Sequence, residues 1–213
     1  MTHARAIDDD SDLTDERVIA RQDALQARAA EILADLELFR VLETVGRPIQ
    51  TGSSVLGLMV ARDIDVTTLC PDLESVAIFD AMRPLVAHPR VHRLSFRNDT
   101  GRWNTDPAYP DGLYWSVSYR TETEVDVNLD WNLDLWFLRE GTTQFDLQHL
   151  ETLPPRLSPV ARLAILRIKE ARHERPGEGA PVRSYEIYEA VLDHGVRTPE
   201  EFSSYLRKRR PQS

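Results

Sequence analysis

The sequence has little that would place the protein outside the cell or in a membrane. It contains a single cysteine, Cys70, so an intramolecular disulfide and a cysteine-based zinc cage are both excluded. Its apolar runs fall far short of the roughly 20 residues that span a bilayer. The N-terminus is acidic and lacks both the basic start and the apolar run of a signal peptide. We therefore expect a cytoplasmic protein.

An excess of positive charge is also absent. The chain carries 26 Lys and Arg residues against 35 Asp and Glu residues, which gives a formal net charge of -9. Binding to nucleic acid or to anionic membranes depends on cations that neutralise phosphates, so this balance argues against bulk attraction to either. A cationic acceptor fits the balance better. The segment Arg207-Lys208-Arg209-Arg210 is locally basic and stands apart from this trend.

The 213 residues suffice for one core domain with a smaller appended one. Residues 1–14 are polar and acidic, with little apolar surface to bury, and are predicted to be disordered. From Asp15 to Val45 the apolar residues recur at helical spacing, which predicts one long helix or two in series. This helix belongs to the expected core at residues 15–152. It either covers the sheet or pairs with a second subunit to form a homodimer.

Short β-branched and aromatic segments predict the strands of that core. The expected strands are residues 49–51, 64–69, 91–96, 113–119 and 129–138, and the last two should pair as antiparallel neighbours. Helical segments lie between strands, at residues 55–60 (about two turns) and 73–86. The pattern is that of an α+β fold, with helix following strand as in an α/β unit.

Pro154-Pro155 marks the start of an expected C-terminal helical subdomain at residues 153–213. Its helices are predicted at residues 158–172, with Ser158 as the cap, at 185–194, and at 200–208 after a Thr198 cap. A loop rich in glycine and proline, residues 175–181, separates the first two.

Two short motifs in the core carry the chemistry. Gly52-Ser53 follows a predicted strand and precedes a predicted helix, a turn whose backbone N–H groups attract phosphate. Asp63 and Asp65 lie two residues apart at the start of the next strand, so both carboxylates project from one face and can share a metal ion, while Ile64 points into the core. A short helix returning to an adjacent strand would bring the turn beside the carboxylates.

With these residues the sequence resembles the nucleotidyltransferase superfamily that includes DNA polymerase beta and the antibiotic nucleotidyltransferases. The family pattern is Gly-Ser, a short gap, Asp-x-Asp, and a third acid on a later strand, and Gly52-Ser53, Asp63 and Asp65 match it over residues 48–138. The resemblance implies a mixed β-sheet flanked by helices and two Mg2+ ions held by the acids. It also implies an NTP co-substrate, whose α-phosphate is attacked by an acceptor hydroxyl with release of pyrophosphate.

Three aspartates of one strand parity compete for the role of third acid: Asp126, Asp130 and Asp134. We choose Asp134, because it lies centrally in an apolar strand, where a carboxylate needs a reason such as metal ligation. Asp126 follows a polar run and falls in an expected hairpin loop. The third acid can also serve as general base for the acceptor hydroxyl, a role equally open to Asp130.

Cationic and aromatic side chains of the C-terminal subdomain could contact the nucleotide. We single out Lys169 as a triphosphate ligand, with Arg162 and Arg167 as further candidates, and Tyr185 or Tyr188 for stacking on a base or ribose. None of them matches a specific motif, and the competing interpretation is that of solvated charges and an ordinary packing face.

Three interpretations of function follow. The first is an active nucleotidyltransferase whose acceptor is a small hydroxylated molecule such as an antibiotic, favoured by the intact acids and the negative net charge. The second is a toxin-like or regulatory nucleotidyltransferase that modifies a protein or the end of an RNA, suggested by the basic tail and by Arg97 and Arg102 near Trp103. The third is a non-catalytic nucleotide-binding module. The residues themselves identify neither the transferred base nor the acceptor.

Overall fold

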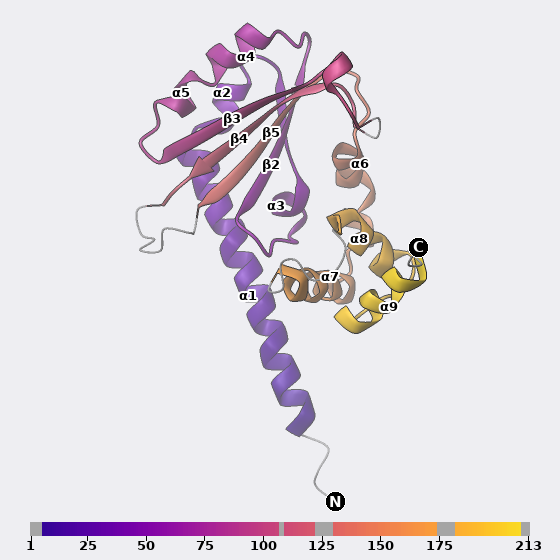
Figure 1. Ribbon diagram of the computed structural model, residues 1–213. Coiled ribbons are helices and arrows are strands. Elements are labelled where there is room, and N and C mark those ends of the chain that lie inside the picture. The colour runs from indigo at the N-terminus through magenta and orange to yellow at the C-terminus, as the bar shows by residue number, and fades with distance from the viewer. Residues whose placement is uncertain (1–5, 107–108, 122–129, 174–181, 210–213) are drawn as a thin grey trace, which may run out of the picture. The chain divides into compact units, whose positions relative to one another are not determined.

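The computed structural model describes residues 6–106, 109–121, 130–173 and 182–209 (Figure 1). The chain divides into two compact units. The sheet unit consists of Gln26–Leu56 and Arg62–Glu151, and the helical unit consists of Met1–Leu25, Gly57–Ala61 and Thr152–Ser213. Within the described ranges, none of the helices combines the length and the apolar character needed to cross a membrane.

Five strands form one mixed sheet in the sheet unit, in the order β1-β2-β5-β4-β3. The strands are β1 (Arg47–Thr51), β2 (Asp63–Cys70), β3 (Val91–Asp99), β4 (Gly112–Tyr119) and β5 (Trp131–Arg139). The central pair β2 and β5 is parallel, and the other neighbouring pairs are antiparallel. The mixed sheet confirms the predicted fold class, and the pairing of β4 with β5 is the antiparallel one that was expected.

Alternation along the central strands gives the sheet an apolar face and a polar face. The buried side chains of β4 and β5 on the apolar face are Leu113, Trp115, Val117, Tyr119, Trp131, Leu133, Leu135 and Phe137. Trp115 meets Phe79 of helix α4 (Ser75–Ala81) with the ring centroids 4.7 Å apart, so α4 covers part of this face. The residues that alternate with these along β5, among them Asp134, are half-buried and project from the opposite face, which carries the candidate site.

The predicted helical segment at residues 15–45 forms two helices, α1 (Ala6–Asp35) and α2 (Leu38–Leu42). Glu37 lies between them with a φ of 45°, a left-handed conformation that interrupts the helix. Helix α1 begins at Ala6, nine residues before Asp15, where the apolar pattern predicted the helix to begin. Of the segment predicted to be disordered, residues 1–5 lie outside the described part of the chain.

The helix expected at residues 55–60 is wrong in its position. The helix after β1 is short, α3 (Gly52–Leu56), and it stops before Gly57, whose φ of 69° breaks the helical path. Leu58, Met59 and Val60 are buried, and their backbone is neither helix nor strand. The apolar run therefore reflects burial and not a helix face.

The predicted helix at residues 73–86 is divided into α4 and α5 (Arg83–Val86). Pro84 lies in the first turn of α5, where its missing N–H is tolerated, whereas inside a continuous helix it would leave a hydrogen bond unmade. Two further short elements complete the sheet unit, the 3-10 helix η1 (Gly101–Trp103) and helix α6 (Phe145–Thr152), which ends at the boundary between the units.

The C-terminal helices of the helical unit are those expected from the sequence. They are α7 (Pro159–His173), α8 (Ser184–Leu192) and α9 (Pro199–Arg209), preceded by the 3-10 helix η2 (Pro154–Arg156). The Ser158 hydroxyl accepts from the N–H of Ala161 at 3.2 Å, and the Thr198 hydroxyl accepts from the N–H of Glu201 at 3.2 Å, as predicted for the caps. The loop predicted at residues 175–181 falls outside the described residues.

Residues 57–61, which we call the strap, belong to the helical unit although the chain on both sides belongs to the sheet unit. Two side chains of α7 hold the backbone of the strap: Arg162 Nε donates to the carbonyl of Gly57 at 2.8 Å, and Lys169 Nζ donates to the carbonyl of Leu58 at 2.6 Å. The strap follows α3 and is separated from the start of β2 by Arg62 alone.

Candidate metal and nucleotide site

Strand β2 presents Asp63 and Asp65 on the polar face of the sheet. Both are half-buried, and Ile64 between them is fully buried on the other face, as the strand alternation predicted. The parallel neighbour β5 pairs Asp65 directly with Asp134. One carboxylate oxygen from each of Asp63, Asp65 and Asp134 lies within 4.8 Å of the other two. The structure thus brings together the three acids that were chosen from the sequence.

An amide and a phenol hold the carboxylates in place. Asn132 Nδ2 donates to Asp63 Oδ1 at 3.0 Å and to Asp134 Oδ1 at 2.8 Å, so one amide bridges two acids from neighbouring strands. The hydroxyl of Ser116 donates to Asn132 Oδ1 at 2.8 Å, which fixes the orientation of the amide. Tyr114 of β4 donates its phenolic hydrogen to Asp134 Oδ1 at 2.6 Å.

Asn132 and Tyr114 were not predicted from the sequence. Asn132 could have been found, since it lies two residues before Asp134 and therefore faces the same side of the strand. Tyr114 depends on the register between β4 and β5, which the sequence does not reveal. Burial, followed by the hydrogen bond to Asp134, raises the pKa of Tyr114, so its phenol remains a hydrogen-bond donor throughout the physiological range.

The turn at Gly52 lies against the carboxylates. Thr51, the last residue of β1, pairs with Asp65, and Gly52 follows with a φ of 68°. A Cβ atom at Gly52 would lie only 2.0 Å from Oδ2 of Asp65, so glycine is required both by the backbone and by the neighbouring side chain. The Ser54 hydroxyl donates to the carbonyl of Thr51 at 3.3 Å and secures the turn. The predicted proximity of turn and acids is present in the structure.

Neither of the other two candidates for the third acid, Asp130 and Asp126, joins Asp63 and Asp65 in the described part of the chain. Asp130 precedes β5 and accepts from Arg120 Nε at 2.8 Å, with His92 Nε2 at 2.7 Å from its other oxygen. The hydrogen bond from Arg120 makes the largest contribution to keeping the pKa of Asp130 below its ordinary value, and the hydrogen bond and charge of His92 act in the same direction. Asp130 is thus part of an ion-pair cluster apart from Asp63 and Asp65. Asp126 lies outside the described residues.

The candidate nucleotide contacts of the C-terminal helices have partners within the helical unit. Lys169 donates to the strap and lies 6.0 Å from the ring centroid of Tyr188, which is itself buried. Arg162 also contacts the strap, and Arg167 forms an ion pair with Asp15. Tyr185 is exposed. A triphosphate contact by Lys169 stays a prediction.

Three carboxylates gathered on one sheet face are suited to binding divalent cations. Carboxylate oxygens are the hard ligands that Mg2+ prefers, and a metal held there acts as a Lewis acid on phosphate oxygens. The glycine turn beside Asp65 provides backbone at close range for a phosphate. The donor set therefore fits the magnesium ions that the sequence resemblance implied.

A mixed five-stranded sheet with a glycine turn after β1 and acids on adjacent β2 and β5 is the nucleotidyltransferase fold, and solved structures share it. A terminal RNA U-transferase superposes with a TM-score of 0.53 at 14% sequence identity, covering 78% of this chain and 45% of its own. Cid1 poly(U) polymerase with MgGTP bound superposes with a TM-score of 0.55 at 14% identity, covering 80% and 50%.

The complex of GLD-2 with RNP-8 gives a TM-score of 0.55 at 13% identity, covering 95% of this chain and 70% of the matched one. The chain spans about half the length of the U-transferase and Cid1 structures. No family model matches the sequence, and no curated protein matches it either. The likeness at these identities is a likeness of fold.

Proposed function

We propose that the protein is a metal-dependent nucleotidyltransferase that moves a nucleoside monophosphate from an NTP to a terminal hydroxyl of an RNA, releasing pyrophosphate. The observation that carries the proposal is the meeting of Asp63, Asp65 and Asp134 within 4.8 Å of one another. The turn at Gly52, packed against Asp65, supports it independently.

The comparisons favour RNA over a small molecule as acceptor. The matched structures include an RNA terminal U-transferase and Cid1 in complex with its short product ApU. The small hydroxylated acceptor that the sequence first suggested, such as an antibiotic, has no support from these structures. The alternative of a nucleotidyltransferase that modifies the end of an RNA fits better.

Each residue of the site has a separate task in the proposed reaction. Asp63, Asp65 and Asp134 would hold the magnesium ions, which when bound supply neutralising charge on the triphosphate. The Gly52 turn admits the phosphates, and Asn132 keeps the carboxylates of Asp63 and Asp134 at a fixed separation. Asp134, as the third acid, accepts the proton of the attacking hydroxyl.

The negative net charge is compatible with an RNA end as acceptor. Net charge describes the whole surface, whereas a terminal nucleotide contacts only the site. Strand β3 carries Arg93 and Arg97 as exposed residues, and the strand register places both on the polar face with the acids. Local cations on this face can engage the last phosphates of an acceptor without bulk attraction to nucleic acid.

The test is a transfer assay on the purified full chain with Mg2+, each α-labelled NTP in turn, and three acceptor sets. The sets are short single-stranded RNAs with a free 3′ end, a panel of hydroxylated small molecules, and the protein itself. We expect labelled RNA that migrates one or more nucleotides longer, with no label on the small molecules. Labelling of small molecules or of protein alone would contradict the proposed acceptor.

Two variants connect the activity to the site. Asp63→Asn removes one carboxylate charge from the cluster and should abolish extension of the RNA. Asp72→Asn is the matched control, because Asp72 follows the far end of β2, its side chain is 79% exposed, and it pairs only at the surface with Arg139. Equal extension by Asp63→Asn and wild type would instead remove Asp63 from the catalytic cluster, and a wild-type protein that binds NTP but extends no acceptor would indicate a non-catalytic module.

A further inference from the structure

Three side chains form a row beside the carboxylates, on the same face of the sheet. The register pairs Arg97 of β3 with Tyr114 of β4, and Tyr114 in turn with Trp136 of β5. Trp136 lies two residues after Asp134 and therefore projects from the same side of β5. We call Arg97, Tyr114 and Trp136 the platform.

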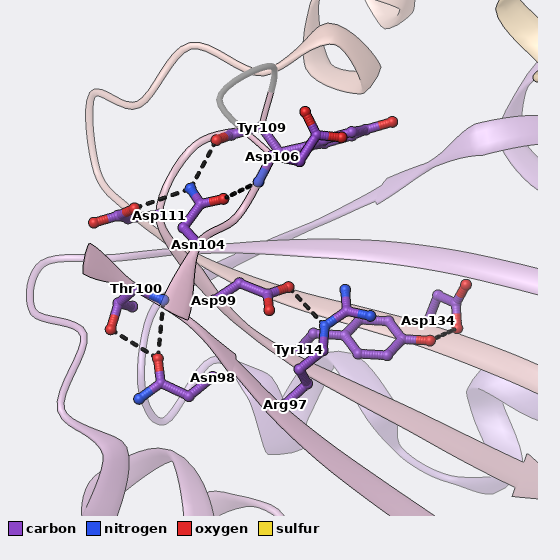
Figure 2. Close-up of polar contacts among 10 residues, drawn as sticks. All are labelled: Arg97, Asn98, Asp99, Thr100, Asn104, Asp106, Tyr109, Asp111, Tyr114 and Asp134. Carbon is purple, nitrogen blue, oxygen red and sulfur yellow. Dashed lines mark hydrogen bonds and ion pairs between the residues drawn. The ribbon is translucent and has the colours of Figure 1, made fainter. Parts of the chain in front are cut away.

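The members of the platform are in contact with one another. The guanidinium carbon of Arg97 lies 4.7 Å from the centroid of the Tyr114 ring and 5.6 Å from that of Trp136. The two aromatic rings are 4.8 Å apart with their planes inclined at 44°. Arg97 Nε also donates to Asp99 Oδ2 at 2.7 Å, which holds the guanidinium over the rings. Figure 2 shows Arg97 beside the Tyr114 ring, with the Tyr114 hydroxyl reaching Asp134.

The platform is accessible, unlike the aromatic residues on the other face. The Arg97 side chain is 58% exposed, and Tyr114 and Trp136 are both half-buried. Trp115 and Phe137, their neighbours in sequence, are buried in the core. Aromatic rings and arginine planes that stay accessible beside a charged site offer surface on which a nucleobase can stack.

The order of the strands distinguishes the two sides of the carboxylates. The Gly52 turn adjoins β1 and β2. Tyr114 on β4 and Arg97 on β3 lie on the other side of Asp134 from that turn, and Trp136 follows Asp134 along β5. In phosphoryl transfer the attacking and leaving oxygens are roughly in line with the phosphorus, so acceptor and pyrophosphate lie on opposite sides of it. With the leaving phosphates at the turn, the acceptor approaches from the platform.

We propose that the platform binds the terminal base of the acceptor by stacking, and so places the attacking hydroxyl at Asp134. The assignment rests on the proposed function, because it presupposes an acceptor that ends in a nucleotide. It makes Arg97, Tyr114 and Trp136 positioning and specificity residues. The phenol of Tyr114 couples the stacked base to the carboxylate that receives the hydroxyl proton.

The test compares two RNA acceptors of identical length, one ending in an ordinary nucleotide and one ending in an abasic nucleotide with the same 3′ hydroxyl. Stacking of a single base contributes roughly 5- to 150-fold in affinity. The wild-type protein should therefore show a KM for the abasic RNA raised by roughly 5- to 150-fold. Trp136→Leu should have a raised KM for the ordinary RNA and should lose most of the discrimination, with the KM for the NTP unchanged.

Matched variants guard against a merely structural effect. Trp103→Leu removes an exposed tryptophan outside the platform, whose ring centroid lies 4.5 Å from the guanidinium carbon of Arg102. This variant should discriminate as wild type does. Trp136→Phe keeps a ring and should keep most of the discrimination. Arg97→Ala changes a surface side chain and leaves the core untouched, and it should also reduce the discrimination. It therefore tests the platform even if Trp136→Leu fails to fold.

Each contrary outcome has a distinct meaning. If the wild-type protein extends no RNA, the proposed function fails. If it extends RNA but Trp136→Leu and Arg97→Ala discriminate as well as wild type, the platform assignment alone is overturned. A KM raised for the NTP, with discrimination between the RNAs intact, would also overturn it by assigning the platform to the nucleotide base. Equal losses in Trp103→Leu and Trp136→Leu would overturn it because stacking would not be localised.

Discussion

Substituting Gly52 by alanine separates backbone strain from damage to the site. Gly52 has a φ of 68°, and a left-handed residue with a Cβ costs about 1–2 kcal/mol. For a chain of this size, that cost lowers Tm by roughly 2–8 °C. In addition, the new Cβ would lie 2.0 Å from Oδ2 of Asp65, far inside van der Waals contact, so the carboxylate or the turn must move. A displacement of about 1 Å at a catalytic group can cost about 100-fold in rate.

Gly141→Ala provides the matched control. Gly141 has a φ of 82°, but among the described residues no atom outside its chain neighbours lies within 4 Å of the Cβ that alanine would add. We expect Gly141→Ala to lose the thermal stability that the backbone strain alone costs, and Gly52→Ala to lose at least as much, measured by circular dichroism. Only Gly52→Ala should lose RNA extension by about 100-fold and Mg2+ binding in calorimetric titration. Full activity of Gly52→Ala, or an equal loss in Gly141→Ala, would refute the claim that the turn and Asp65 form one site.

Three further predictions concern single residues. Asp134→Asn should reduce transfer by at least about 100-fold, and Asp130→Asn should leave it near wild type; the reverse ranking in a transfer assay would move the third acid to Asp130. The hydrogen bond from Tyr119, and after it the nearby cations, lowers the pKa of Asp35 from 3.8. The ionised Asp35 therefore stabilises the fold fully at neutral pH, and this stabilisation is lost as the pH falls through the lowered pKa. The Tm difference between wild type and Asp35→Asn should shrink below about pH 4, and a constant difference would contradict this. Burial raises the pKa of Cys70 to about 11, so its thiol should resist a disulfide-exchange reagent at pH 8 until denaturant is added; rapid reaction of the native protein would show it to be accessible.

Local sequence patterns were enough to predict the parts of the site that adjoin in the chain. Asp63 and Asp65 share a face because strand alternation makes them do so, and the turn at Gly52 follows β1 as expected. Asp134 was chosen because a carboxylate in an apolar strand is unusual, and the structure brings it to the other two. The role of these residues in transfer stays a prediction.

Contacts that depend on strand order were not predictable in the same way. Tyr114 meets Asp134 only because β4 pairs with β5 in one particular register, and a slip by one residue would turn Tyr114 to the other face. The strap was read as a helix because apolar spacing over a few residues does not distinguish a short helix from a buried loop. The split of the predicted segment at residues 15–45 depended on the unusual conformation of Glu37, which its residue type does not indicate.

The strap has a consequence for protein engineering. Because residues 57–61 belong to the helical unit while Gly52 and Asp63 on either side belong to the sheet unit, neither unit is a continuous stretch of sequence. A chimera that exchanges the C-terminal helices alone would separate Leu58 from its Lys169 partner. A successful exchange has to transplant the strap and the start of α1 together with α7, α8 and α9. The two junctions at the ends of the strap then fall next to α3, which begins at Gly52, and next to β2, which carries Asp63 and Asp65.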